Sequence, residues 1–216
     1  MITRYGYDVY FTVFGICVAI IVVAVILTEI GPMRYAAFIV SGVTLLFATN
    51  FFRDPERNTP SVEKGIISPA DGKVITVKEV EQPEYLGGRS IMISIFMSPL
   101  NVHVNRNPIS GTVEYLRYVP GEYFAAYEDK ASEKNEQSVI GLKNKFGKIL
   151  FKQIAGFVAR RIVYELKVGE SVTAGERFGM IKFGSRVDLF VPVRSRINVK
   201  VGDRAVAGES VLAEFL

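Results

Sequence analysis

The 216-residue sequence has one histidine, one cysteine and no tryptophan, so the side chains that most often build catalytic and metal sites are scarce. Cys17 has no second cysteine to pair with, which excludes an intramolecular disulfide and a cysteine-based metal site. The sequence also lacks a Walker-type glycine loop and a dinucleotide-binding glycine pattern. We therefore predict no metal, and any acid–base chemistry near neutral pH is expected to involve His103.

Charged residues are missing from two long runs near the N-terminus. The run from Val9 to Thr28 has roughly 20 residues, which at a rise of about 1.5 Å each match a hydrocarbon core of about 30 Å. A second run, from Tyr35 to Phe52, is close to the lower limit for a membrane span. These runs predict that residues 1–52 form a transmembrane helical hairpin turning at Gly31-Pro32.

These runs also allow two other interpretations. A cleavable signal peptide has an apolar core of about 7–15 residues, whereas the first run is longer and is followed by a second one. A buried helical pair in a soluble core remains an alternative, because both runs contain small and polar residues.

The distribution of basic residues predicts the orientation of the hairpin. Basic residues lie before and after it, at Arg4, Arg53, Arg57 and Lys64, whereas the connecting turn has Arg34 against Glu29. Both ends are therefore expected to be cytoplasmic, with the rest of the chain facing the cytoplasm from the inner (cytoplasmic) membrane. The net charge of +4 suits an anionic membrane surface, and without a basic block no nucleic-acid partner is predicted.

Residues 53–216 have the pattern of a mainly β domain, with short segments rich in Val, Ile, Phe and Thr between turn-forming residues. The expected strands are 65–67, 73–79, 90–97, 111–118, 138–144, 148–154, 158–166, 177–181, 187–192 and 210–215. One helix is expected around Ala125–Asn135, where charge is dense and Gly and Pro are absent.

A short repeat gives a further indication of the fold. Val168–Glu176 recurs as Val201–Glu209, and each copy fits two tight turns joining short strands. The repeat resembles turns of lipoyl- and biotinyl-type domains. We therefore expect a lipoyl-like β-sandwich/barrel hybrid preceded by the helical hairpin.

Seven motifs follow one another along the chain: FFRDPER (51–57), SPADG (68–72), NVHVNR (101–106), DKASEKNE (129–136), QIAG (153–156), ARR (159–161) and FGSRVD (183–188). In this order, and over nearly the whole length, the sequence resembles short-type phosphatidylserine decarboxylase proenzymes, a family that includes archaetidylserine decarboxylases. The resemblance implies a membrane-bound carboxy-lyase of phospholipid biosynthesis.

For Gly184 and Ser185 the resemblance implies autocatalytic cleavage of a zymogen. The Ser185 hydroxyl attacks the Gly184 carbonyl, and elimination and hydrolysis leave a pyruvoyl group at position 185. A β chain would then end at Gly184, and an α chain starting at Ser185 would remain associated with it. Glycine before the nucleophile leaves the carbonyl open to attack. Without the other motifs, Gly184-Ser185 fits an ordinary turn between strands.

The resemblance also implies how the mature enzyme works. The pyruvoyl group at Ser185 would form a Schiff base with the serine headgroup of a phospholipid in the bilayer and, without PLP, convert it to ethanolamine with release of CO2. His103 would be the general base and acid, and Asp71 would orient it. The purely structural alternative for His103 is a strand histidine bonded to the backbone, and for Asp71 it is an Asp-Gly hairpin turn.

Three arginines are candidate ligands of the headgroup: Arg106, Arg160 and Arg161. Several long-type relatives have two histidines three residues apart, and Arg106 occupies the second position here, where it is a poor base but a good anion ligand. DKASEKNE is interpreted as a lid or membrane-facing helix, or as a solvated charged helix.

The main alternative function is a membrane-tethered lipoyl-like carrier or adaptor without catalysis. Its support is Gly179–Lys182, because such carriers present a modifiable lysine on a tight turn. A purely structural hairpin-anchored domain would explain the apolar runs but not the motif order. The sequence is compatible with a homo-oligomer.

Overall fold

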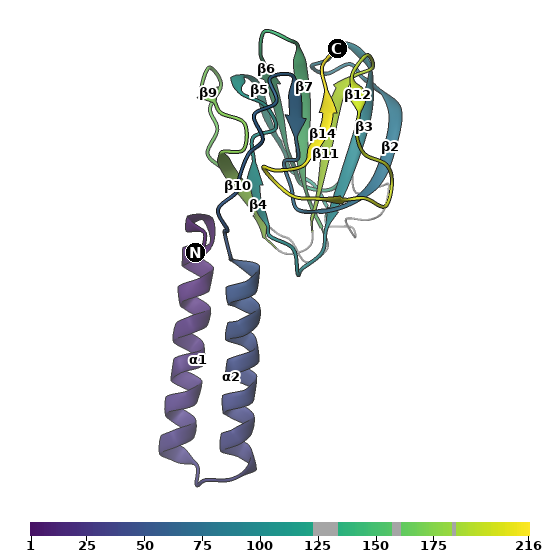
Figure 1. The fold of residues 1–216 in the computed structure, drawn as a ribbon. Coiled ribbons are helices and arrows are strands. Elements are labelled where there is room, and N and C mark those ends of the chain that lie inside the picture. Colours follow the sequence, from purple (N-terminus) through teal and green to yellow (C-terminus); the bar gives the residue numbers. More distant parts are fainter. Residues whose placement is uncertain (123–133, 157–160, 183–184) are drawn as a thin grey trace. The chain divides into compact units, whose positions relative to one another are not determined.

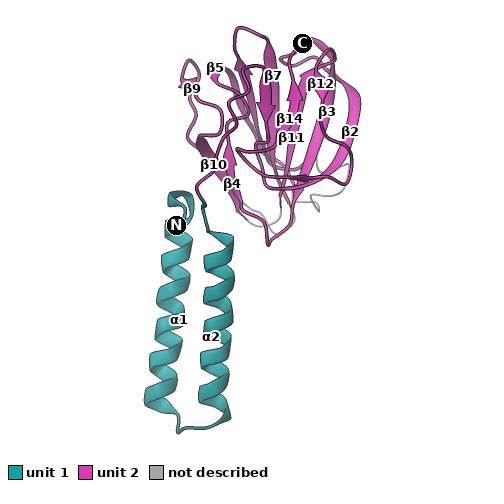
Figure 2. Ribbon diagram, viewed as in Figure 1, with its two compact units in different colours: residues 1–55 teal, residues 56–216 magenta. Residues whose placement is uncertain are grey.

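The computed structural model describes residues 1–122, 134–156, 161–182 and 185–216. It divides into two compact units, Met1–Pro55 and Glu56–Leu216, and each is described by itself (Figures 1 and 2). The long helices belong to the first unit, and the strands belong to the second.

The first unit is a pair of helices, α1 (Tyr7–Leu27) and α2 (Pro32–Phe51), preceded by the 3-10 helix η1 (Arg4–Gly6). The helices lie side by side (Figure 1), and most of their few buried side chains are small: Cys17, Ala24, Ser41 and Ala48. Small residues let helix backbones approach closely. Proline in the first turn of α2 needs no backbone N–H bond, so this helix begins before the expected Tyr35.

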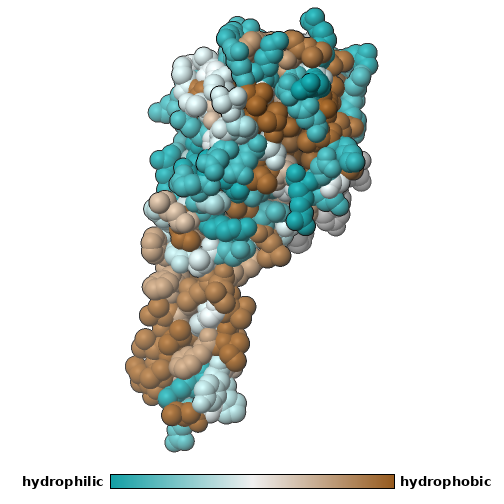
Figure 3. Space-filling model, in the orientation of Figure 1, coloured by the Kyte–Doolittle hydropathy of each residue, from teal (hydrophilic) through white to brown (hydrophobic). Residues whose placement is uncertain are grey.

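Most apolar side chains of both helices are exposed. Ile26 and Leu46 are each 72% exposed, and Figure 3 shows hydrophobic side chains over the helical unit. By length and composition both helices are able to cross a membrane. A helix pair from a soluble core would bury side chains of this kind.

The second unit is built on an eight-stranded antiparallel sheet that curls around a core, in the order β13-β2-β3-β11-β7-β6-β5-β9 (Figure 1). Its strands are β2 (Gly72–Gln82), β3 (Gly88–Met97), β5 (Gly111–Val119), β6 (Gln137–Lys143), β7 (Lys148–Ala155), β9 (Ser171–Val172), β11 (Ser185–Pro192) and β13 (Arg204–Ala205). Alternate residues of each strand face the core, such as Ile93 and Ile95 of β3.

Two three-stranded sheets complete this unit. One contains β1 (Gly65–Ile67), β14 (Val211–Glu214) and β12 (Arg196–Ile197). The other contains β4 (Val104–Arg106), β10 (Arg177–Lys182) and β8 (Arg161–Tyr164). The chain therefore changes sheets between β10 and β11, the segment that contains residues 183 and 184.

The prediction of a mainly β chain with an N-terminal helical pair is confirmed. The strand expected at 187–192 begins two residues earlier, at Ser185. Strand β4 was not predicted, because it has three residues and contains Asn105, a residue type that is rare in strands. Of the strand expected at 158–166, the structure contains β8, and residues 157–160 lie outside the described part. The helix expected at 125–135 also falls outside it, except for residues 134 and 135.

The repeat forms the turns that the sequence predicts. Each copy contains one two-residue strand, β9 in the first and β13 in the second. Both glycines of each copy have φ between 78° and 102°, at positions 169, 175, 202 and 208. This region favours glycine because a Cβ atom would be strained there.

Candidate active site

Ser185 is the first residue of β11, in the middle of the large sheet. It pairs with Met97 on one side and with Ala155 on the other. Its side chain is fully buried, and its hydroxyl donates to the Met97 sulfur at 3.3 Å. Gly184, the other half of the expected cleavage site, lies outside the described residues. The nucleophile candidate is thus held by backbone pairing on both sides.

The strand that precedes Ser185 in the chain, β10, belongs to another sheet. β10 pairs with β4 and β8, whereas β11 pairs with β3 and β7. Because β10 and β11 do not pair with each other, a chain break between them would remove no strand pairing from either sheet.

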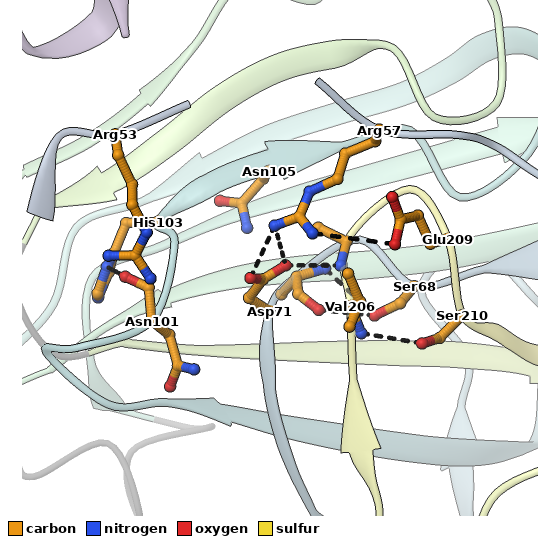
Figure 4. Close-up of polar contacts among 12 residues, drawn as sticks. Arg53, Arg57, Ser68, Asp71, Asn101, His103, Asn105, Val206, Glu209 and Ser210 are labelled. Carbon is orange, nitrogen blue, oxygen red and sulfur yellow. Dashed lines mark hydrogen bonds and ion pairs between the residues drawn. The ribbon is translucent and has the colours of Figure 1, made fainter. Parts of the chain in front are cut away.

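His103 is buried just before β4, next to the strand that leads toward Ser185. Its carbonyl accepts the N–H of Ile181 of β10 at 3.3 Å. Its ring Nδ1 lies 2.9 Å from the Asn101 carbonyl oxygen, which can only accept, so Nδ1 carries the proton of the neutral ring (Figure 4). Nε2 is then the basic nitrogen. The histidine can therefore be held by the backbone through Nδ1 and still act as a base through Nε2, so the structural and the catalytic interpretations of His103 are compatible.

A chain of buried polar side chains connects three of the sequence motifs. The Asn105 amide donates to the Pro69 carbonyl at 3.2 Å and lies 3.9 Å from the same Met97 sulfur that Ser185 contacts. Gln153 donates to Asn105 at 2.9 Å. The SPADG, NVHVNR and QIAG motifs, far apart in sequence, therefore meet beside the start of β11.

Asp71 does not bond to His103 within the described structure. Its carboxylate accepts from Arg57 at 2.9 and 3.1 Å (Figure 4) and from the backbone N–H of Ala207 at 2.7 Å. The Asn101 carbonyl holds Nδ1 of His103 instead. The orienting role of Asp71 therefore stays a prediction, and in this structure Asp71 joins the segment before β1 to the second repeat.

The three candidate arginine ligands have different environments. Arg106, on β4, is buried and donates to the Gly175 carbonyl at 2.9 Å. A Cβ atom at Gly208 would lie 2.8 Å from its Cδ, so its side chain lies against both copies of the repeat. Arg161 is exposed on β8, and Arg160 lies outside the described residues. Headgroup binding by these residues stays a prediction.

Sequence reasoning missed a buried ion pair within the FGSRVD motif. Nε of Arg186 lies 2.6 Å from the Asp188 carboxylate, and Arg186 also donates to the Ser94 hydroxyl at 2.8 Å. Both charged side chains are at most 1% exposed. Residues two apart on a strand share a face, so the Arg-Val-Asp spacing contained the signal for this pair.

Comparison with known sequences identifies the family. The family model described as phosphatidylserine decarboxylase matches residues 44–213. The chain belongs to the phosphatidylserine decarboxylase family. It is 44% identical over 217 residues to the phosphatidylserine decarboxylase proenzyme of Pelodictyon phaeoclathratiforme, covering 100% of both chains. It is 52% identical over 188 residues to that of Salinibacter ruber, covering 86% of this chain and 81% of the relative.

Membership of the phosphatidylserine decarboxylase family favours a decarboxylase over the carrier alternative. The structure adds a second argument, because a carrier presents its lysine on an exposed turn. Lys182 is instead the last residue of β10 and only 4% exposed. Among the described residues, no group of three His, Cys, Asp or Glu side chains is arranged to hold a metal ion.

Proposed function

We propose that the chain is a self-processing, pyruvoyl-dependent decarboxylase that converts the serine headgroup of a phospholipid to ethanolamine and releases CO2. The observation that carries the proposal is the position of Ser185, buried at the start of β11 where the chain passes between two sheets. The substrate is phosphatidylserine or archaetidylserine, which share the reacting headgroup.

Self-processing starts from the Ser185 hydroxyl. Its oxygen attacks the carbonyl carbon of residue 184, the peptide C–N bond breaks, and an ester joins the two residues. Loss of the α-proton and of the ester carboxylate then leaves residue 184 as a free carboxyl terminus and position 185 as dehydroalanine. Addition of water and loss of ammonia produce the pyruvoyl group. His103 is proposed to take the hydroxyl proton at Nε2.

The surroundings of Ser185 suit a pyruvoyl group. This group is uncharged and no larger than the serine from which it forms. The Met97 sulfur beside it is an uncharged, weak hydrogen-bond acceptor, so the site is compatible with a neutral group. Its carbonyl supplies the electron sink for loss of CO2. β11 remains paired along both edges, which supports an α chain that stays associated with the β chain after the break.

His103 is proposed to return a proton to the carbon that loses CO2, and the Asn101 carbonyl holds the ring for this step. Asp71 is proposed to support that orientation. Arg106, Arg160 and Arg161 remain candidates for the headgroup phosphate.

We further propose that residues 1–52 anchor the enzyme and that residues 53–216 form the catalytic domain. The exposed apolar side chains of α1 and α2 support insertion into the bilayer that holds the substrate. Basic residues before and after the hairpin favour the cytoplasmic face of the inner membrane.

The proposal is tested with phosphatidylserine and, separately, archaetidylserine, each labelled in the carboxyl carbon of its serine. The purified full-length chain should release labelled CO2 from mixed micelles, and Ser185→Ala should release none. A wild-type chain that is folded and cleaved but releases no labelled CO2 from either lipid would refute the decarboxylase assignment.

A further inference from the structure

A hollow at one edge of the large sheet carries two exposed cations. Its volume is about 680 Å³, and its lining includes Lys73, Phe96, Ser98, Asn101 and Arg204. Lys73 of β2 and Arg204 of β13 are directly opposite each other in the strand pairing, and both are exposed. Within the described structure, neither side chain makes a hydrogen bond or an ion pair.

The acid that lines this hollow already has other partners. Asp71 lines the same hollow, but its carboxylate is occupied by Arg57 and by the Ala207 N–H. Like charges directly opposite each other on paired strands destabilise a sheet. An anion bound between Lys73 and Arg204 would offset this repulsion, and a phosphate accepts from both cation types.

The hollow lies at the same edge of the sheet as the reactive residue. β2 begins at Gly72, β3 ends at Met97 and β11 begins at Ser185, and these three strands are neighbours. Lys73 pairs with Phe96, which also pairs with Arg186. The Lys73 side chain therefore lies on the opposite face of the sheet from Ser185, one residue from the strand ends that both faces share. Two strand spacings correspond to about 10 Å across the sheet.

The hollow is also lined by the residue that holds the candidate base. Asn101 lines it and accepts from Nδ1 of His103 at 2.9 Å. In a serine phospholipid, three covalent bonds separate the reacting α-carbon from the phosphorus. A headgroup reacting at position 185 therefore places its phosphate close to its reacting carbon, within the span that long cationic side chains cover.

We infer that Lys73 and Arg204 form the subsite for the phosphodiester of the lipid headgroup. This inference rests on the proposed function, and it assigns the phosphate to residues outside the sequence-predicted arginines. Arg106, by contrast, is buried with its guanidinium on the Gly175 carbonyl.

The test measures binding and catalysis separately on the full-length chain in detergent. Binding of glycerophosphoserine, the water-soluble headgroup, and of inorganic phosphate is measured by equilibrium dialysis. KM and kcat are measured with phosphatidylserine in mixed micelles. The variant is Lys73→Gln with Arg204→Gln. The matched control is Lys78→Gln with Lys200→Gln, which removes the same charge from exposed residues outside the hollow.

We expect the Lys73/Arg204 variant to bind glycerophosphoserine at least about tenfold more weakly and to raise KM similarly, since charged hydrogen bonds are lost. Its kcat and the extent of chain cleavage should change less than about threefold. The Lys78/Lys200 control should match the wild type. Lys73→Arg with Arg204→Lys should retain most of the binding, and equal thermal midpoints would show that all variants are folded.

The outcomes separate the inference from the proposed function. Equal headgroup binding by the Lys73/Arg204 variant and the control overturns the inference even if CO2 is released. A site that takes inorganic phosphate but not glycerophosphoserine also overturns the headgroup assignment. If the wild type releases no CO2 but binds glycerophosphoserine through both cations, the anion subsite is supported and the decarboxylase proposal fails.

Discussion

Arg186 and Asp188 form a fully buried ion pair, with Nε 2.6 Å from the carboxylate, on the strand that Ser185 begins. Their side chains share one face of β11, and Ser185 belongs to the alternate set of residues. The ion pair and the hydrogen bond to Ser94 therefore fix the first residues of β11 from the face opposite the reactive hydroxyl.

Asp188→Asn should destabilise the chain strongly, because it leaves the Arg186 charge buried beside a neutral amide. Removing one partner of a buried ion pair lowers the free energy of unfolding by about 3–5 kcal/mol. Thermal unfolding in detergent, in the uncleaved Ser185→Ala background, should show a midpoint several degrees lower. Arg186→Met with Asp188→Leu should recover part of the loss. A midpoint equal to that of the parent would contradict this role.

His103→Gln should slow self-cleavage by about 10²-fold or more, because glutamine keeps a hydrogen-bond donor for the Asn101 carbonyl but supplies no base. The measurement is the fraction of cleaved chain against time after synthesis. Asn101→Ala serves as the comparison, since the His103 contact is made by the backbone carbonyl and should survive. Cleavage of His103→Gln at the wild-type rate would exclude His103 as the base.

Asp71→Asn and Arg57→Gln separate two roles of Asp71. If Asp71 orients His103, Asp71→Asn should slow cleavage about tenfold or more while Arg57→Gln has a smaller effect. Both changes weaken the contact that joins these two residues, so both should lower the thermal midpoint. Equal effects of the two changes on the cleavage rate would assign Asp71 to its Arg57 contact alone.

Lys152 should make the stability of the fold vary with pH in the alkaline range. It lies opposite Asp188 on β7, and burial lowers the pKa of Lys152 below its usual 10.5, although Glu84 and Asp188 partly oppose this shift. Between the folded pKa and 10.5 the unfolded chain binds more protons than the folded chain, so the cost of burying this charge falls and stability rises with pH.

Lys152→Met removes that contribution. The thermal midpoint of the parent minus that of the variant, measured in the Ser185→Ala background, should therefore rise as pH increases from 7 toward 10.5. Tyrosines that titrate at alkaline pH are common to both chains and cancel in this difference. A difference that stays constant or falls with pH would contradict the assigned shift.

Much of the fold follows from local patterns in the sequence. The uncharged runs predict α1 and α2, and alternating apolar residues predict long strands such as β3 and β7. The glycines of the repeat predict its turns because a left-handed backbone favours them. The start of β2 shifted by one residue and that of β11 by two, since cross-strand pairing decides where a strand begins.

The site was less predictable because its contacts are long-range. His103 was found from its chemistry as the single histidine, and Ser185 from the motif order that carries the family resemblance. The structure brings their segments together through Met97 and Asn105. The Arg57–Asp71 contact was not predicted, because an Asp-Gly pair alone indicates only a turn. Lys73 and Arg204 carry no sequence signal until the pairing of β2 with β13 places them opposite each other.

Intact-mass spectrometry of the full-length wild-type chain beside Ser185→Ala tests the central claim most directly. We predict two wild-type fragments meeting between residues 184 and 185, with the smaller lighter by one ammonia than a fragment that begins with serine. Ser185→Ala should stay a single chain. A single full-length wild-type chain in a folded preparation, or a small fragment with an intact N-terminal serine, would contradict self-processing to a pyruvoyl enzyme.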